Sequence, residues 1–296
     1  MAIAWVFPGQ GSQKLGMAAG VLELPGARER FAEASDLLGR DLLAICDGSA
    51  KGPDADLNST GNTQPALYVL ESLLVDGLRA QGRTADLVAG HSLGELVALY
   101  AAGVFDFTTG LGLIQARSAL MAEAGGGAMT AVMGFDRAEL DALVAGHDGV
   151  VIANDNSSAQ VVLSGTPEAV AQVSGALTCK RAIPLAVSGA FHSPFMAGPA
   201  ARFAATLDTV AFADAAIPVL SNTDPTPQTD EAALKHRLRD QMTTGVRWRE
   251  TMDALVAAGV DTTVEIGPGN VLSGLIKRSC PSISTAQVAG AADLGL

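Results

Sequence analysis

The sequence of 296 residues has few cysteines and no long apolar run, and each shortage excludes a class of protein. Its three cysteines, Cys46, Cys179 and Cys280, are scattered and lack the paired spacing of metal ligands. We therefore expect neither a disulfide framework nor a metal site. The early apolar segment Ile3–Phe7 lacks a basic start, and no run reaches the ~18 apolar residues of a membrane span. We expect a cytoplasmic protein that does not contact membranes.

Basic residues are also scarce, with 19 Lys and Arg against 31 Asp and Glu and a formal net charge of −12. An acidic chain without a run of Lys or Arg cannot follow a phosphate backbone, so nucleic acid is excluded as a partner. Hydrophobic residues, by contrast, make up 48% of the chain. A chain of this length and composition buries a large core, which favours a compact α/β protein of one large domain or two smaller ones.

The stretch Leu87–Leu96 (LVAGHSLGEL) predicts the centre of the molecule, because a short apolar strand meets a Gly-x-Ser-x-Gly turn and then a helix. In such a nucleophile elbow the turn is too tight for side chains beside the serine, so the Ser92 hydroxyl stands exposed. The helix dipole and the backbone N–H of Leu93 then favour negative charge there. A plain strand–helix turn with a capping serine is the alternative interpretation.

Around the elbow, apolar runs of strand length alternate with longer segments of helical spacing, which is typical of a parallel sheet. The expected elements are a strand at Ile3–Phe7, helices at Arg28–Leu43, Thr63–Gln81 and Gly110–Ala124, a helix ending near Leu207, a strand at Ile217–Ser221, helices at Glu231–Met242 and Trp248–Ala258, a strand at Val260–Ile266 and a helix at Leu272–Lys277. The final segment, Ala286–Leu296, is expected to be peripheral.

Three consecutive glycines, Gly125–Gly127, mark the clearest break in the chain. The elements expected after it are a strand at Ala128–Phe135, a helix at Asp136–Ala145, strands at Val150–Asn154 and Gln160–Ser164, a helix at Pro167–Leu177 and a strand at Arg181–Ala186. This βαββαβ order is that of a ferredoxin-like unit. We expect it to be inserted into the larger α/β domain over residues 127–188.

A serine nucleophile needs a base, and the chain has four histidines. His91 is expected to point away from the elbow, while His147 in a Gly-His-Asp-Gly turn and His236 in a Lys-His-Arg run are expected to be solvated. His192 remains, in an uncharged stretch before Pro194. Burial there would keep the ring neutral, as a general base requires near pH 7. A purely structural histidine is the alternative.

No acidic residue stands out as the group that orients His192. The acidic residues between Ser92 and His192 lie mostly at expected helix starts or turns. A backbone carbonyl can hold an imidazole ring instead, which would give a Ser–His dyad.

Two other features require an explanation. Arg117 interrupts the apolar stripe of its expected helix, although a solvated surface position is the alternative. The loop Pro8–Gln13 contains two glycines that free its backbone to approach a ligand, but it lacks the Walker A pattern. Phosphate-loop chemistry is therefore excluded.

Several motifs occur in the order found in one known family. They are Phe7–Gln13 (FPGQGSQ), Gly90–Glu95 (GHSLGE), Gln115–Met121 (QARSALM), Ala190–Ser193 (AFHS) and Gly267–Gly269 (GPG). On these motifs, which cover about residues 1–280, the chain resembles the bacterial malonyl-CoA:acyl-carrier-protein transacylases. The resemblance implies an α/β fold in which residues 1–126 and 189–296 form a large α/β-hydrolase-like domain with a parallel sheet. Residues 127–188 form the inserted ferredoxin-like small domain.

The resemblance also implies the catalytic roles. Ser92 is the nucleophile and His192 is its base. The backbone N–H groups of Gln10 and Leu93 form the oxyanion hole.

For recognition and orientation, the resemblance points to two more residues. Arg117 binds the malonyl carboxylate, which its planar fork can hold bidentately. Gln241 matches the family glutamine whose main-chain carbonyl orients His192. The chain departs from the family at Gly245, where proline is common.

The implied reaction is a ping-pong transfer that uses malonyl-CoA as substrate, forms a malonyl-serine intermediate and needs no bound cofactor. The acceptor is the phosphopantetheine thiol of an acyl carrier protein, and the product supplies fatty-acid synthesis. Because such carriers are acidic, we expect docking through basic residues near the mouth of the site. The candidates are Lys180, Arg181, Lys277 and Arg278. We expect the enzyme to be a monomer.

Three alternatives remain open. The first is a free-standing acyltransferase of a polyketide synthase or of a malonate decarboxylase; Gly189–His192 (GAFH) resembles the malonyl-type pattern of polyketide acyltransferases. The second is a serine hydrolase or thioesterase, which Arg117 and the competition between water and thiol discriminate. The third is a non-catalytic carrier-binding subunit, which the presence of Ser92 and His192 argues against.

Overall fold

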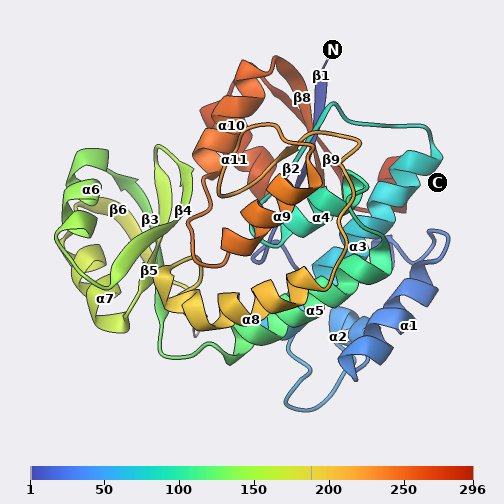
Figure 1. The fold of residues 1–296 in the computed structure, drawn as a ribbon, viewed down its shortest axis with the longest axis horizontal. Helices are drawn as coiled ribbons and strands as arrows, with labels where there is room; N and C mark the ends of the chain where they lie inside the picture. The colour runs from blue at the N-terminus through green and yellow to red at the C-terminus, as the bar shows by residue number, and fades with distance from the viewer. Residues whose placement is uncertain (1, 188, 296) are drawn as a thin grey trace.

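The computed structural model describes residues 2–187 and 189–295, and its centre is a parallel sheet (Figure 1). The sheet has the strand order β7-β2-β1-β8-β9, and every neighbouring pair within it is parallel. The strands are β1 (Ala2–Phe7), β2 (Leu87–Gly90), β7 (Val219–Leu220), β8 (Val260–Ile266) and β9 (Ser284–Val288). Strands β1 and β2 are nearly all apolar because helices cover both faces of the sheet.

The helices of this unit surround a central one, α3, which is buried along most of its length. A helix that is buried on nearly every side needs neighbours on every side, and α3 packs against α1, α4 and α5. The helices are α1 (Ala27–Leu38), α2 (Leu42–Asp47), α3 (Thr60–Ala80), α4 (Gly94–Ala101), α5 (Phe107–Glu123), α8 (Ala197–Asp208), α9 (Glu231–Asp240), α10 (Trp248–Ala257) and α11 (Val271–Ser279), with short 3-10 turns at Met17–Gly20, Pro194–Met196 and Ala291–Leu294. Within the described residues, no helix combines the length and hydropathy needed to cross a membrane.

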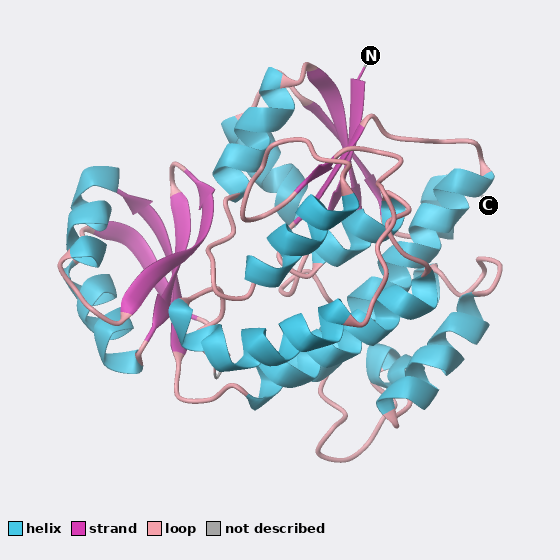
Figure 2. Ribbon diagram, in the orientation of Figure 1, coloured by secondary structure: helices cyan, strands magenta, loops and turns pink. Residues whose placement is uncertain are grey.

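A second sheet stands apart from the first, as the two groups of strands in Figure 2 show. Its elements are β3 (Ala128–Phe135), α6 (Arg137–Ala145), β4 (Val150–Ser157), β5 (Gln160–Gly165), α7 (Pro167–Ala176) and β6 (Cys179–Pro184). The strand order β4-β5-β3-β6 is antiparallel, and α6 and α7 pack on the sheet through an apolar cluster of their own. The predicted fold class, α/β with a parallel sheet and a separate βαββαβ unit, is confirmed. The domain limits stay a prediction, and the limits set at residues 1, 188 and 296 lie outside the described residues.

The single helix predicted over Arg28–Leu43 is wrong, because the chain forms α1 and α2 there. Helix α1 ends at Gly39, whose φ of 67° is left-handed and is readily adopted by glycine. Asp41 then caps α2 by accepting a hydrogen bond from the Ala44 N–H. The apolar spacing continues across this break, so periodicity alone does not reveal it.

The C-terminal segment is not peripheral. Strand β9 extends the parallel sheet by pairing with β8 from Thr262↔Ser284 to Ile266↔Val288. Leu294 is buried against α3, so closely that a Cβ placed on Gly77 would lie 2.5 Å from its Cδ1. A short strand of small and polar residues gives little apolar signal, and its pairing with β8 is what places it at the edge of the parallel sheet, with Val288 buried.

Candidate active site

The elbow connects the end of β2 to the start of α4, as predicted. Its two glycines are required by space: a Cβ on Gly90 would lie 1.9 Å from the Gly94 oxygen, and one on Gly94 would lie 2.2 Å from the Phe7 oxygen. Ser92 itself has a left-handed φ of 54°, a conformation that is costly for a residue with a side chain. The turn therefore holds the Ser92 hydroxyl outward at the carboxyl end of the sheet.

Asn222, just after β7, secures the elbow from the neighbouring strand. Its Oδ1 accepts a hydrogen bond from the Ser92 N–H at 2.7 Å, and its Nδ2 donates to the Gly90 oxygen at 2.6 Å. Asn222 is not among the residues predicted from the sequence. The available signal is its position at the carboxyl end of a parallel strand, where binding groups collect.

His192 lies against the serine. Its Nε2 is 2.7 Å from Ser92 Oγ, and its Nδ1 is 2.9 Å from the main-chain oxygen of Gln241. A carbonyl can only accept, so Nδ1 carries the proton and Nε2 is free to accept the serine proton. Like Ser92, His192 has a positive φ (55°), and in the described part of the chain these two are the only residues other than glycine that do.

Burial, followed by the nearby positive charge of Arg117, lowers the pKa of His192 to about 3. The ring is therefore neutral at physiological pH, which is the state that a general base needs.

Arg117 on α5 is fully buried, with 0% of its surface exposed, so the solvated alternative is wrong. Its Nη1 donates to Gln64 Oε1 at 2.6 Å, and its Nε and Nη2 donate to Gln241 Oε1 at 3.2 and 2.9 Å. Nη2 also lies 3.1 Å from Ser92 Oγ. Burial lowers the pKa of Arg117 to about 10, so the group stays charged. The cation thus contacts only neutral acceptors, and an anionic ligand would supply the negative charge that these acceptors lack.

A cavity of about 100 Å³ joins these groups. A cavity of this volume suits a small acyl group rather than a fatty chain. Its lining includes Gln10, Gln64, His91, Ser92, Leu93, Arg117, Met121, Met129, Asn154, Leu185, Val187, Phe191 and His192. The second sheet and the segment after it provide Met129, Asn154, Leu185 and Val187, which nothing in the sequence singled out.

Gln10 and Leu93, the predicted oxyanion donors, lie on this cavity beside Ser92. Leu93 immediately precedes α4, where backbone N–H groups have no partner within the helix. In the described structure neither N–H donates to a protein acceptor. Both donors are placed for an oxyanion, and their role stays a prediction.

His91 hydrogen-bonds away from the nucleophile, since its Nε2 lies 2.8 Å from Asn156 Oδ1 on β4. Burial lowers its pKa. Nearby, a Cβ on Gly245 would lie 2.7 Å from the Ile152 oxygen, so glycine at this position lets the loop after α9 approach β4 closely. Gly245 therefore lies at a contact between this loop and the second sheet.

The predicted docking residues separate into two groups. Lys180 and Arg181 are exposed on β6, shortly before Leu185 of the cavity. Lys277 and Arg278 lie in the last turn of α11, which runs back from the carboxyl end of β8.

The next strand, β9, starts with Ser284 paired to Thr262 near the beginning of β8. Lys277 and Arg278 are therefore at the opposite end of the sheet from Ser92. Carrier docking through these two residues stays a prediction, and the reversed direction of the helix argues against it.

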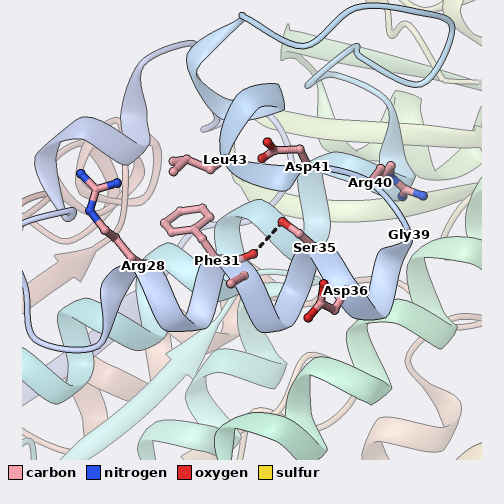
Figure 3. Close-up of a pocket in the computed structure, with 9 residues that line it drawn as sticks. Arg28, Phe31, Ser35, Asp36, Gly39, Arg40, Asp41 and Leu43 are labelled. Carbon is pink, nitrogen blue, oxygen red and sulfur yellow. Dashed lines mark hydrogen bonds between the residues drawn. The ribbon is translucent and has the colours of Figure 1, made fainter.

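A wider cavity of about 630 Å³ lies between α1 and α2 (Figure 3). Its polar groups maintain the fold: Ser35 Oγ donates to the Phe31 oxygen, and Arg40 donates to the Gly61 oxygen, which has no helical donor because Pro65 lacks an N–H. It has no nucleophile paired with a base. Elsewhere too, the described residues contain no cluster of three or more side chains able to hold a metal.

Comparisons with known proteins agree with this geometry. The family model described as "Acyl transferase domain" matches residues 4–294. The chain is 50% identical over 294 residues to the malonyl CoA-acyl carrier protein transacylase of Synechocystis sp., covering 99% of each chain. A crystal structure of the Synechocystis enzyme superposes with a TM-score of 0.95 at 49% identity, covering 100% of this chain and 99% of the other. A malonyl-transacylase solved with a type II PKS acyl-carrier protein has a TM-score of 0.91 at 39% identity, covering 99% and 98%.

Proposed function

The chain belongs to the acyl transferase domain family, and on that basis we propose that it moves a malonyl group from malonyl-CoA to the phosphopantetheine thiol of an acyl carrier protein. The observation that carries the proposal is that a base and a buried cation both contact the hydroxyl oxygen of Ser92. Ser92 Oγ lies 2.7 Å from the neutral base His192 and 3.1 Å from the buried cation Arg117.

In the first half-reaction His192 Nε2 takes the proton of Ser92 Oγ while the oxygen attacks the thioester carbonyl of malonyl-CoA. A C–O bond forms, and the oxyanion is bound by the N–H groups of Gln10 and Leu93. Collapse breaks the C–S bond, and the departing CoA sulfur takes the proton from Nε2. The products are malonyl-Ser92 and CoA.

The second half-reaction reverses these roles. The carrier thiol gives its proton to His192 Nε2 and attacks the ester carbonyl. A C–S bond forms, the C–O bond to Ser92 breaks, and Ser92 recovers its proton from His192. Atoms and charges balance without a cofactor.

Arg117 selects the acyl group. A malonyl carboxylate reaching the guanidinium supplies the anion that the neutral contacts of Gln64, Gln241 and Ser92 do not. An acetyl group leaves the cation without that partner. The cavity of about 100 Å³ also disfavours a thioesterase for long acyl chains.

In this proposal the carrier belongs to fatty-acid synthesis, which is consistent with the 50% identity to the malonyl CoA-acyl carrier protein transacylase of Synechocystis sp.. A polyketide carrier is the second candidate. We place the enzyme in the cytoplasm as a monomer; its free cysteines, Cys46, Cys179 and Cys280, suit a reducing compartment.

Intact-protein mass measurement tests the proposal. Incubation with malonyl-CoA should add one malonyl group, which should be lost on Ser92→Ala and discharged by the carrier with free phosphopantetheine thiol. Discharge by water at the same rate would favour the hydrolase. Absence of any acyl-enzyme would overturn the proposal.

A further inference from the structure

Gln241 does two separate things at the site. Its main-chain oxygen accepts the His192 Nδ1 proton, and its side-chain Oε1 accepts two N–H bonds from Arg117. The base and the carboxylate-binding group therefore meet at one residue. The first contact is fixed by the backbone, whereas the second depends on which way the side-chain amide points.

The amide orientation is set by acceptors on its other side. Gln241 Nε2 donates to the Ser92 main-chain oxygen at 2.9 Å and to Glu95 Oε2 at 2.7 Å. Both acceptors require the nitrogen on that side, which leaves Oε1 facing Arg117, a group that can only donate. Glu95 Oε2 also accepts from the Asn222 N–H at 3.0 Å, so the carboxylate itself is held in place.

Glu95 is fully buried, with 0% exposed, and it has no role in the reaction described above. Burial lowers the pKa of Arg117, and the negative charge of Glu95 opposes that lowering although no hydrogen bond joins the two groups. One amide, that of Gln241, separates them. A carboxylate in direct contact would occupy the guanidinium, whereas one held behind an amide leaves it available for substrate.

We propose that Glu95 is a positioning residue for acyl selection: by fixing the side-chain amide of Gln241, it aims the Arg117 guanidinium at the malonyl carboxylate. The inference rests on the proposed function, because it assumes that Arg117 binds that carboxylate. Glu95 touches neither Ser92 Oγ nor the cavity, so its effect is on selectivity and not on acyl transfer in general.

The test measures acylation of Ser92 by malonyl-CoA and acetyl-CoA in quenched-flow experiments. Glu95→Ala should lower the ratio of kcat/KM for malonyl over acetyl about tenfold, in the range of the loss of one hydrogen bond to a charged group. The loss should appear mainly in the malonyl KM, while acetyl acylation stays within about twofold. A parallel loss for both thioesters would show a structural role and overturn the proposal.

The conservative variant separates orientation from charge. Glu95→Gln keeps an oxygen that can accept from Gln241 Nε2 and the Asn222 N–H, so selectivity should stay within about threefold of the wild type. A loss as large as that of Glu95→Ala would assign the effect to the charge and overturn the proposal. Glu71→Ala is the matched control: it removes another buried carboxylate, one that bonds to neither Gln241 nor Arg117, and should leave the ratio unchanged.

If Glu95→Ala does not fold, Gln241→Met should show the same loss of malonyl over acetyl selectivity. This variant removes the side-chain amide and keeps the main-chain oxygen that accepts from His192. Unchanged selectivity in that variant would overturn the proposal. The wild-type arm tests the proposed function separately: a wild type that prefers acetyl contradicts the function, whereas malonyl preference that survives loss of Glu95 contradicts the positioning.

Discussion

The two sheets contribute different things to one cavity. The parallel unit supplies the reactive groups: the nucleophile Ser92, the base His192 and the cation Arg117. It also supplies Gln241, whose main-chain oxygen holds the base. The antiparallel unit and the segment after it supply a wall of four side chains with no ionisable group among them: Met129, Asn154, Leu185 and Val187. The parallel unit therefore provides the reactive groups, and the antiparallel unit with the segment after it shapes the cavity.

The difference follows from how each sheet ends. In the parallel sheet, the loops after β1, β2 and β7 all leave from the same edge, so polar groups distant in sequence converge there. The antiparallel sheet has no such edge, and it reaches the site through two uncharged side chains, Met129 of β3 and Asn154 of β4. Backbone bonds from Val246 N to the Ala153 oxygen and from Asp155 N to the Val246 oxygen attach its strand β4 to the parallel unit.

The largest effect is expected from removing the reactive side chains of the parallel unit. Ser92→Ala should abolish the acyl-enzyme, and His192→Ala should slow its formation by about three orders of magnitude or more. The double variant should be little worse than Ser92→Ala, because the two residues act as a unit. Intact-mass and quenched-flow measurements check this; additive losses would place the role of His192 elsewhere.

Arg117→Ala tests whether the parallel unit also selects the acyl group through its buried cation. A charge-assisted pair contributes roughly 1.5–3 kcal/mol, so kcat/KM for malonyl-CoA should fall about 10- to 150-fold. Acetyl acylation should hold steady or improve, because the unpaired buried cation no longer opposes it. Arg117→Lys keeps the charge without the fork and should fall between. Parallel losses for malonyl and acetyl in all variants would contradict the assignment.

Substitutions in the wall should change which sizes of acyl group are accepted and should hardly change the rate of malonyl acylation. Leu185→Ala enlarges the cavity, so methylmalonyl-CoA should gain about tenfold relative to malonyl-CoA, in line with the small value of a methyl group in a pocket. Malonyl acylation itself should change by less than about threefold. Competition between the two thioesters, read by mass, checks this, and a collapse of malonyl acylation would show that the wall has a catalytic role.

Carrier docking should depend on the small unit and not on the far end of the parallel one. Reversing the charges of Lys180 and Arg181 should raise the carrier KM about fivefold, with less effect at high salt, while acylation by malonyl-CoA is unchanged. The matched control reverses Lys277 and Arg278, which lie at the opposite end of the sheet. Equal effects of the two double variants would contradict docking on β6.

The smallest predicted effect is one of pH. Because burial and Arg117 lower the pKa of His192 to about 3, the neutral base persists at acid pH. Acylation by saturating malonyl-CoA should therefore change less than about twofold between pH 8 and 5, where an ordinary histidine would lose about thirtyfold. Circular dichroism at each pH establishes that the chain is folded. An acid limb near pH 6.5 would contradict the burial of the base.

Features that depend on neighbouring residues can be predicted from the amino-acid sequence alone. The elbow around Ser92 needs its glycines within a few residues, and the βαββαβ order follows from local periodicity and turns. His192 was found by eliminating the other histidines, and Arg117 because it interrupts an apolar stripe.

Features that depend on contacts between distant residues require the folded chain. The partners of Arg117, Gln64 and Gln241, lie 53 and 124 residues away, and a main-chain carbonyl carries no sequence signal of the histidine it holds. Strand β9 acquires its place by pairing with β8, and α11 moves Lys277 and Arg278 away from the site by reversing the chain. Periodicity reports which face of a segment is buried, whereas the packing of segments decides what each face meets.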